Sequence, residues 1–91
     1  LELLRYFMFI GNIRKQEQFL QQAELNIIDI NQDYFMFERF TEHERALITI
    51  NRTGEEREFV LPKKYQNKSK KYTLNKSEKG YLSPYGGIVI K

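Results

Sequence analysis

This 91-residue sequence contains no cysteine, no tryptophan and a single histidine. Without cysteine there is no disulfide framework and no thiolate metal site, and an oxidising compartment is neither required nor excluded. Metal sites need three or four converging ligands, which one histidine does not supply. The sequence therefore indicates no cofactor and no metal.

Long hydrophobic runs and catalytic motifs are also missing. The longest apolar run, YFMFI at residues 6–10, is far shorter than the roughly 20 residues that span a bilayer, so we expect no membrane segment. There is no G-x-S-x-G, no phosphate-binding glycine loop and no H-E-x-x-H. Nothing in these 91 residues points to catalysis.

The composition that is present fits one small globular domain. Hydrophobic residues make up 41% of the chain and charged residues 30%, which is too apolar for intrinsic disorder and too charged for a membrane protein. Seven phenylalanines and six tyrosines favour a β-sheet core. The net charge of +3 is a mild basic bias that identifies no partner by itself.

Residues 1–19 are predicted to form a helix, because apolar residues recur at helical spacing and residues 14–18 are strong helix formers. The first ten residues leave almost no polar face, and such a helix is normally buried on all sides. The chain also starts on Leu1 inside this apolar pattern, so we expect a longer polypeptide with a surface that this helix contacts. The expected docking face consists of Leu4, Phe7, Met8 and Ile10. Through the same helix we expect the isolated chain to self-associate.

Residues 20–91 alternate apolar and polar residues with a period of two between turn residues, which is typical of strands. The sequence predicts an antiparallel β-sandwich, Greek-key-like, preceded by the N-terminal α-helix. Alternation in residues 45–51 indicates a sheet with one face in water. The last strand begins in the Gly86–Gly87 turn and is expected to close the sheet. The predicted strands are residues 24–30, 34–40, 45–51, 55–61, 71–74, 80–82 and 87–90.

Residues 62–80 carry seven lysines and two tyrosines, a pattern that can bind nucleic-acid phosphates and stack on bases. This hypothesis would place Lys68, Lys70 and Lys71 on the phosphates. The stretch has no arginine and is rich in loop residues, so a solvated loop is favoured and a nucleic-acid partner is not expected.

Exposed tyrosines can stack on the apolar face of a sugar ring. The candidates are Tyr65, Tyr72, Tyr81 and Tyr85. Sugar-binding platforms more often use tryptophan, so packing is the favoured interpretation for most of them.

The remaining polar candidates favour simple interpretations. His43 lies between Glu42 and Glu44 in an expected hairpin loop, where neighbouring side chains do not converge as metal ligands do. A run of acids is expected to solvate a strand edge, and its members are Glu55, Glu56 and Glu58. Glycosylation sequons start at three asparagines and are attributed to chance in a chain of this composition, namely Asn51, Asn67 and Asn75.

Three segments together resemble one family. The closing LSPYGGIVIK resembles the end of α-amylase family (glycoside hydrolase family thirteen) proteins, where a similar turn enters the last strand of a C-terminal β-sandwich. The segment ALITINRTGEEREFVLP is similar to the central hairpin of that domain. Upstream, IRKQEQFLQQAELNIIDI resembles the last helix of the catalytic barrel running into the first sandwich strand.

The resemblance implies that residues 1–19 are the end of an upstream catalytic barrel and that residues 20–91 are its C-terminal domain. The family's catalytic acids would lie before Leu1, and none is carried over to this chain. The parent enzyme would cleave or transfer α-glucosidic bonds by a retaining mechanism, and this module would be a non-catalytic accessory with the barrel as its partner. A carbohydrate-binding module for starch or maltodextrin and a small basic nucleic-acid-binding barrel stay open as alternatives.

Overall fold

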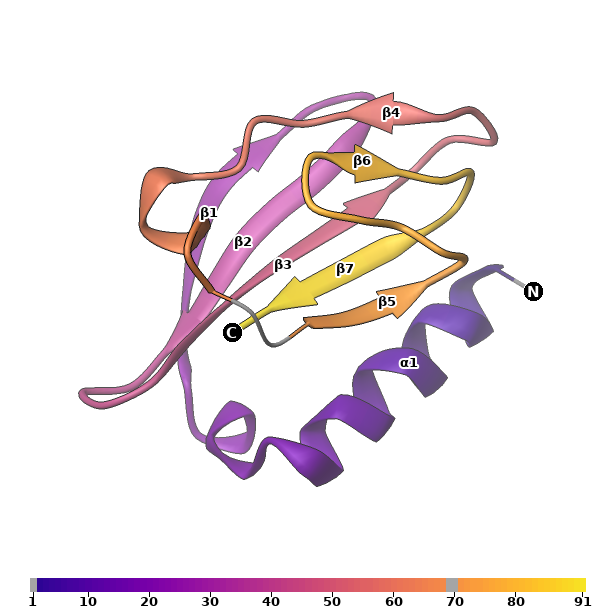
Figure 1. Ribbon diagram of the computed structural model, residues 1–91. Coiled ribbons are helices and arrows are strands. Elements are labelled where there is room, and N and C mark those ends of the chain that lie inside the picture. The colour runs from indigo at the N-terminus through magenta and orange to yellow at the C-terminus, as the bar shows by residue number, and fades with distance from the viewer. Residues whose placement is uncertain (1, 69–70) are drawn as a thin grey trace.

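The computed structural model describes residues 2–68 and 71–91, which form a mainly β protein with one α-helix. Helix α1 (Glu2–Gln16) leads through the 3-10 helix η1 (Gln18–Gln21) into a five-stranded antiparallel sheet of order β1-β2-β3-β7-β5 (Figure 1). The strands of this main sheet are β1 (Glu24–Ile30), β2 (Tyr34–Phe40), β3 (Arg45–Asn51), β5 (Lys71–Leu74) and β7 (Gly87–Ile90). A small second sheet pairs β4 (Arg57–Glu58) with β6 (Tyr81–Leu82), next to the 3-10 helix η2 (Lys63–Tyr65).

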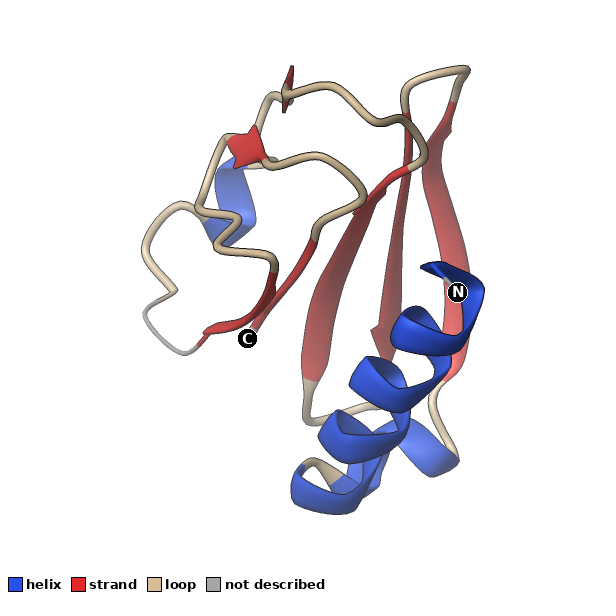
Figure 2. Cartoon of the chain, turned by 90° about the vertical axis from the view of Figure 1, so that its right-hand side faces the viewer, coloured by secondary structure: helices blue, strands red, loops and turns tan. Residues whose placement is uncertain are grey.

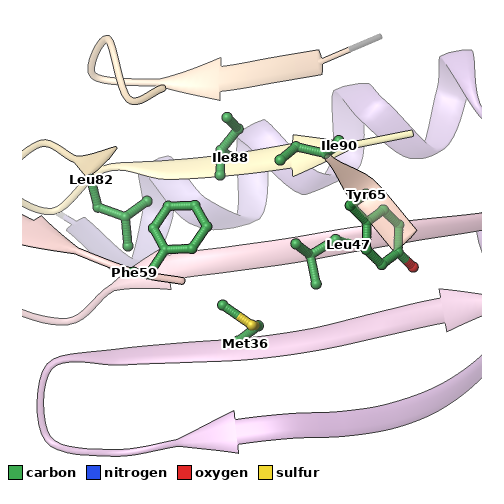
Figure 3. Packing of buried hydrophobic residues seen from close by; sticks show 7 residues of the cluster. All are labelled: Met36, Leu47, Phe59, Tyr65, Leu82, Ile88 and Ile90. Atoms are coloured by element: carbon green, nitrogen blue, oxygen red, sulfur yellow. The ribbon is translucent and has the colours of Figure 1, made fainter. Parts of the chain in front are cut away.

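Both faces of the main sheet carry a packed core around β3 and β7. Ile13 of α1 and Leu20 of η1 pack with residues of β3 and β7 in one cluster, which we call the helix-side core. The opposite face carries the outer core, where β2, β3 and β7 pack against the small sheet and η2 (Figure 3). Its members are Met36, Leu47, Phe59, Tyr65, Leu82, Ile88 and Ile90. In Figure 2, α1 and the small sheet lie well apart from each other. The predicted sandwich-like β fold with a leading helix is therefore confirmed.

Strand β3 lies at the centre of this arrangement. Ala46 and Ile48 belong to the helix-side core, while Leu47 belongs to the outer core. Thr49 and Asn51, on the same face as Leu47, are also fully buried. The expectation of one face in water is wrong for this strand, because the small sheet covers the face on which the polar residues lie.

Tight turns set the register of the first three strands. The Asn31 side-chain oxygen accepts hydrogen bonds from the backbone N–H groups of Asp33 and Tyr34 at 2.8 and 2.9 Å, which fixes the β1–β2 turn. In the β2–β3 turn the Thr41 N–H donates to the Glu44 carbonyl at 2.8 Å. Both hairpins therefore form from local contacts, and the strand bounds match the sequence prediction.

Three elements were predicted to be longer than they are. The predicted strand 55–61 is reduced to β4, the predicted strand 80–82 to β6, and the predicted helix ends at Gln16. Among the described residues the small sheet forms two residue pairs, Arg57 with Leu82 and Glu58 with Tyr81, so both of its strands are short. Phe59 nevertheless enters the outer core, as its apolar character predicts.

The last strand, β7, pairs with β3 and β5 inside the main sheet and not with β6, its predecessor in the chain (Figure 1). The turn before it is tight, since a Cβ on Gly86 would overlap the hydroxyl oxygens of Ser77 and Ser83. The buried Asn51 amide donates to the carbonyls of Ser83 and Glu55 at 2.9 and 2.7 Å and holds this turn against the end of β3. Among the described residues, no helix has the length and apolarity that crossing a membrane requires.

Candidate docking surface

Helix α1 is apolar on two sides. Phe9, Ile10 and Ile13 pack toward the helix-side core. Three further apolar side chains point to solvent, and we call them the helix patch: Leu4 is 58% exposed, Phe7 67% and Met8 61%. Three of the four residues of the expected docking face are therefore uncovered, whereas Ile10 is half-buried in the chain's own core.

A second uncovered apolar surface lies on β1 and β2. Its lining, which we call the sheet groove, consists of Leu25, Ile27, Ile30, Phe35 and Phe37. In the register of the two strands Ile27 faces Phe37 and Ile30 faces Phe35. Phe37 also touches the helix-side core, so the groove is on the face of the sheet that α1 partly covers. The sequence did not predict this surface, because the pattern of β1 is that of a regular strand and does not indicate the bulge.

A β-bulge in β1 creates the groove. With a strict period of two, Leu25 and Ile27 would share their face with Asp29. The register shifts between Ile27 and Asp29, so that Asp29 pairs with Met36 on the outer-core face and Ile30 takes the next position on the groove face. The bulge replaces a carboxylate by an isoleucine in the groove.

An arginine stands at each end of the sheet groove. Arg39 pairs with Leu25 across the strands, and its Nη2 donates to the carbonyls of Leu20 and Ala23, both at 2.9 Å. At the other end the Arg52 guanidinium lies 4.3 Å from the centre of the Phe35 ring and donates to the Asn31 carbonyl at 2.8 Å. Neither guanidinium forms an ion pair with an acidic residue of the described chain.

Glu38 on the outer-core face is buried at the centre of a polar cluster. Its carboxylate accepts hydrogen bonds from the Tyr65 hydroxyl at 2.7 Å, from Asn26 at 2.9 Å and from Lys64 at 3.1 Å. Burial alone would raise the pKa of Glu38, but these donors and the Lys64 charge outweigh it and lower the pKa to about 2. Burial and the Glu38 carboxylate raise the pKa of Tyr65. The cluster fastens η2 to β2 and is structural, since every partner is engaged within the chain.

A second buried carboxylate, Glu17, joins the end of α1 to the sheet. It accepts a hydrogen bond from the Tyr72 hydroxyl at 2.5 Å and pairs with the Lys91 ammonium at 2.6 Å. Lys91 also reaches Glu44 at 2.8 Å and stands 4.7 Å from the centre of the Phe19 ring. Burial lowers the pKa of Lys91, but the two carboxylates outweigh it and raise the pKa overall. We call Glu17, Tyr72 and Lys91 the helix latch.

The structure does not gather the four candidate tyrosines into a platform. Tyr65 is fully buried in the outer core and cannot contact a sugar in the folded chain, which corrects that assignment. Tyr72 packs against the helix-side core, on the opposite face of the main sheet. Tyr81 lies in the small sheet, where the pKa of its hydroxyl is raised by a hydrogen bond to Glu56. Tyr85 is 39% exposed in the turn before β7.

The other candidates lie scattered over the surface. His43 is exposed beside Glu42, with its Nε2 at 4.0 Å from the carboxylate. Lys68 and Lys71 are exposed, and Lys70 is outside the described residues. Asn51 is fully buried, so its sequon is unavailable in the folded chain, whereas Asn67 and Asn75 are exposed. Within residues 2–68 and 71–91, no group of three potential metal ligands comes together.

The chain matches no protein-family model, and no curated protein shows significant similarity to it. The features that bear on function are the two uncovered apolar surfaces and the sequence resemblance.

Proposed function

We propose that this chain is a non-catalytic, stabilising C-terminal module of an α-glucan-active glycoside hydrolase of the α-amylase family, and that α1 contacts the catalytic barrel. The observation that carries the proposal is the helix patch: Leu4, Phe7 and Met8 expose most of their surface while the opposite side of α1 packs on the chain's own sheet. An apolar patch of this kind marks an interaction site.

The fold supports the same assignment. The resemblance requires a β-sandwich whose last strand follows the Leu-Ser-Pro-Tyr-Gly turn, and β7 lies inside the main sheet directly after that turn. We assign catalysis to the upstream barrel, where two carboxylates of the parent enzyme would act on α-glucosidic bonds. The buried carboxylates of this chain, Glu17 and Glu38, are both engaged by cations and tyrosines of the fold.

The decisive experiment uses the complete reading frame that contains Leu1. We expect it to encode a barrel with the family's catalytic acids before this segment. In the full-length enzyme, the triple variant Leu4→Ser, Phe7→Ser, Met8→Ser should lower the melting temperature of the barrel by several degrees and leave the KM for a maltodextrin unchanged. The variant Val60→Ser is the matched control, because Val60 is 86% exposed and lies outside α1.

Two outcomes would overturn the proposal. One is a reading frame without an upstream barrel. The other is a full-length enzyme whose melting temperature does not respond to the changes in the helix patch. Titration of the isolated chain with maltoheptaose and with a random oligonucleotide separates the alternatives, and we expect binding of neither.

A further inference from the structure

The sheet groove is separate from the helix patch and has its own shape. Helix α1 packs over β3, β7 and β5, and Phe37 of β2 reaches the same core, so on that face the apolar side chains of β1 are the ones left uncovered. Each strand takes up about 4.8 Å of the width of a sheet, so two strands form a strip about 10 Å wide. This width is close to the roughly 10–12 Å diameter of an α-helix with its side chains. Seven residues of β1 extend about 23 Å, the length of a helix of about 15 residues. The strip has room for one helix beside α1, which itself has 15 residues.

The chemistry of the groove restricts what such a helix carries. The groove-facing positions of β1 and β2 comprise five apolar residues and Arg39, and Arg52 stands at the far end against Phe35. The bulge at Ile28 turns Asp29 away from this face. An occupant therefore meets an apolar floor with a positive charge at each end. Two copies of this chain placed groove to groove would bring like charges together, which disfavours a symmetric dimer through this face.

The edge of β1 is a poorer site than its face. An added strand would need a regular row of backbone donors and acceptors, and the bulge interrupts that row in the middle of β1. Burial against the groove instead uses side chains that are already exposed, since Leu25, Ile27 and Ile30 each expose more than half of their surface.

We propose that the sheet groove binds an acidic amphipathic α-helix of a protein partner, with its apolar stripe on Leu25, Ile27, Ile30, Phe35 and Phe37 and its carboxylates at Arg39 and Arg52. The occupant lies alongside α1 on the main sheet. This second contact surface stands independently of the glycoside hydrolase assignment, because it depends only on the shape and charge of β1 and β2.

The test uses two synthetic 15-residue peptides labelled with fluorescein. Both carry the same leucine stripe, flanked by glutamates in one and by lysines in the other. By fluorescence anisotropy the acidic peptide should bind the intact chain at least tenfold more tightly than the basic one, and its circular dichroism should become helical on binding. Equal affinity of the two peptides, or an acidic peptide that binds without becoming helical, would overturn the proposal.

Paired variants locate the site. Ile27→Ser removes part of the groove floor and should weaken the acidic peptide at least fivefold, whereas Val60→Ser removes an exposed apolar side chain elsewhere and should not. Arg52→Gln and Lys63→Gln change the net charge equally, but only Arg52→Gln should weaken binding, by about threefold or more. Circular dichroism and melting temperature check that each variant is folded.

Three results would contradict the location or the occupant. Equal losses in the two charge variants would indicate general attraction to a basic chain. Unchanged binding in Ile27→Ser would place the peptide elsewhere. A dimer in sedimentation velocity that Ile27→Ser abolishes, without peptide binding, would assign the groove to a second copy of this chain.

Discussion

At the scale of single residues, the buried polar groups of this chain hold loops and ends to the sheet. Glu38 is the clearest case, because four side chains from three other segments donate to one carboxylate that is almost fully removed from water. A buried carboxylate with this many donors stabilises the fold only while it is ionised. The stability of the chain should therefore depend on pH through this residue.

Acid should destabilise the chain through Glu38. Its pKa is lowered from the ordinary value of 4.5 to about 2 on folding, so its contribution is fully present above pH 4.5 and is lost as the pH falls toward 2. The difference corresponds to about 3 kcal/mol. Urea unfolding at several pH values should show Glu38→Gln less stable than the unchanged chain by about 2–3 kcal/mol at pH 7, with the two curves converging near pH 2. A constant difference across this range would contradict the assignment.

Gly86 and Gly11 should respond in opposite ways to alanine. A Cβ at Gly86 would overlap Ser77, Ser83 and the Leu74 carbonyl, whereas a Cβ at Gly11 in α1 meets nothing within 4 Å. We expect Gly86→Ala to cost about 1–3 kcal/mol through overpacking and Gly11→Ala to stabilise α1 by about 0.5–1 kcal/mol. Thermal unfolding measures both, and each 1 kcal/mol should shift the melting temperature by about 4–8 °C. A stable Gly86→Ala variant would mean that the turn can relax.

At the scale of elements, the sequence pattern predicted the bounds of the strands in the main sheet. It did not predict the bounds of the strands in the small sheet, whose length depends on tertiary contacts. The hairpins of β1, β2 and β3 carry their own turn signals, β5 alternates in burial, and β7 is a short apolar run after a glycine turn, so their bounds could be predicted. The ends of β4 and β6 depend on how far two distant segments pair, which no local pattern records. The bulge in β1 is a feature of its pairing with β2 and has no turn or glycine signal in the sequence, so the groove was not predictable.

The helix latch should control how firmly α1 is held. Tyr72→Phe removes only the hydroxyl that donates to Glu17 at 2.5 Å, and a hydrogen bond to a charged group contributes about 1.5–3 kcal/mol. Hydrogen exchange should then become faster in α1 amides than in β3 or β7 amides, because the helix opens from the sheet before the sheet unfolds.

Tyr81→Phe is the matched control for the latch. It removes a tyrosine hydroxyl that is bonded to Glu56 in the small sheet, away from α1. Its effect on α1 exchange should be negligible. Equal acceleration of α1 and β3 in Tyr72→Phe would show that the helix and the sheet unfold as one unit, and the latch would then have no separate role.

At the scale of the whole molecule, the chain buries two cores and leaves apolar surface on one side. The outer core is closed by the small sheet and η2, while on the helix side α1 covers only part of the main sheet and exposes its own outer flank. The apolar character of residues 1–10 made the helix patch predictable from sequence. Its extent was overestimated at Ile10, because helical spacing alone does not tell which apolar side meets the chain's own sheet.

The helix patch leads to a prediction for the isolated chain. Without a partner, Leu4, Phe7 and Met8 stay in water, and burying each side chain is favourable by about 1.5–3 kcal/mol. Because association costs about 4–15 kcal/mol, we expect a weak self-association with a Kd in the micromolar to millimolar range. In sedimentation velocity the mass should rise above 11.0 kDa with concentration, and the triple variant Leu4→Gln, Phe7→Gln, Met8→Gln should stay monomeric. A monomeric mass at every concentration, or a triple variant that still associates, would show that the uncovered flank of α1 does not drive contacts between copies.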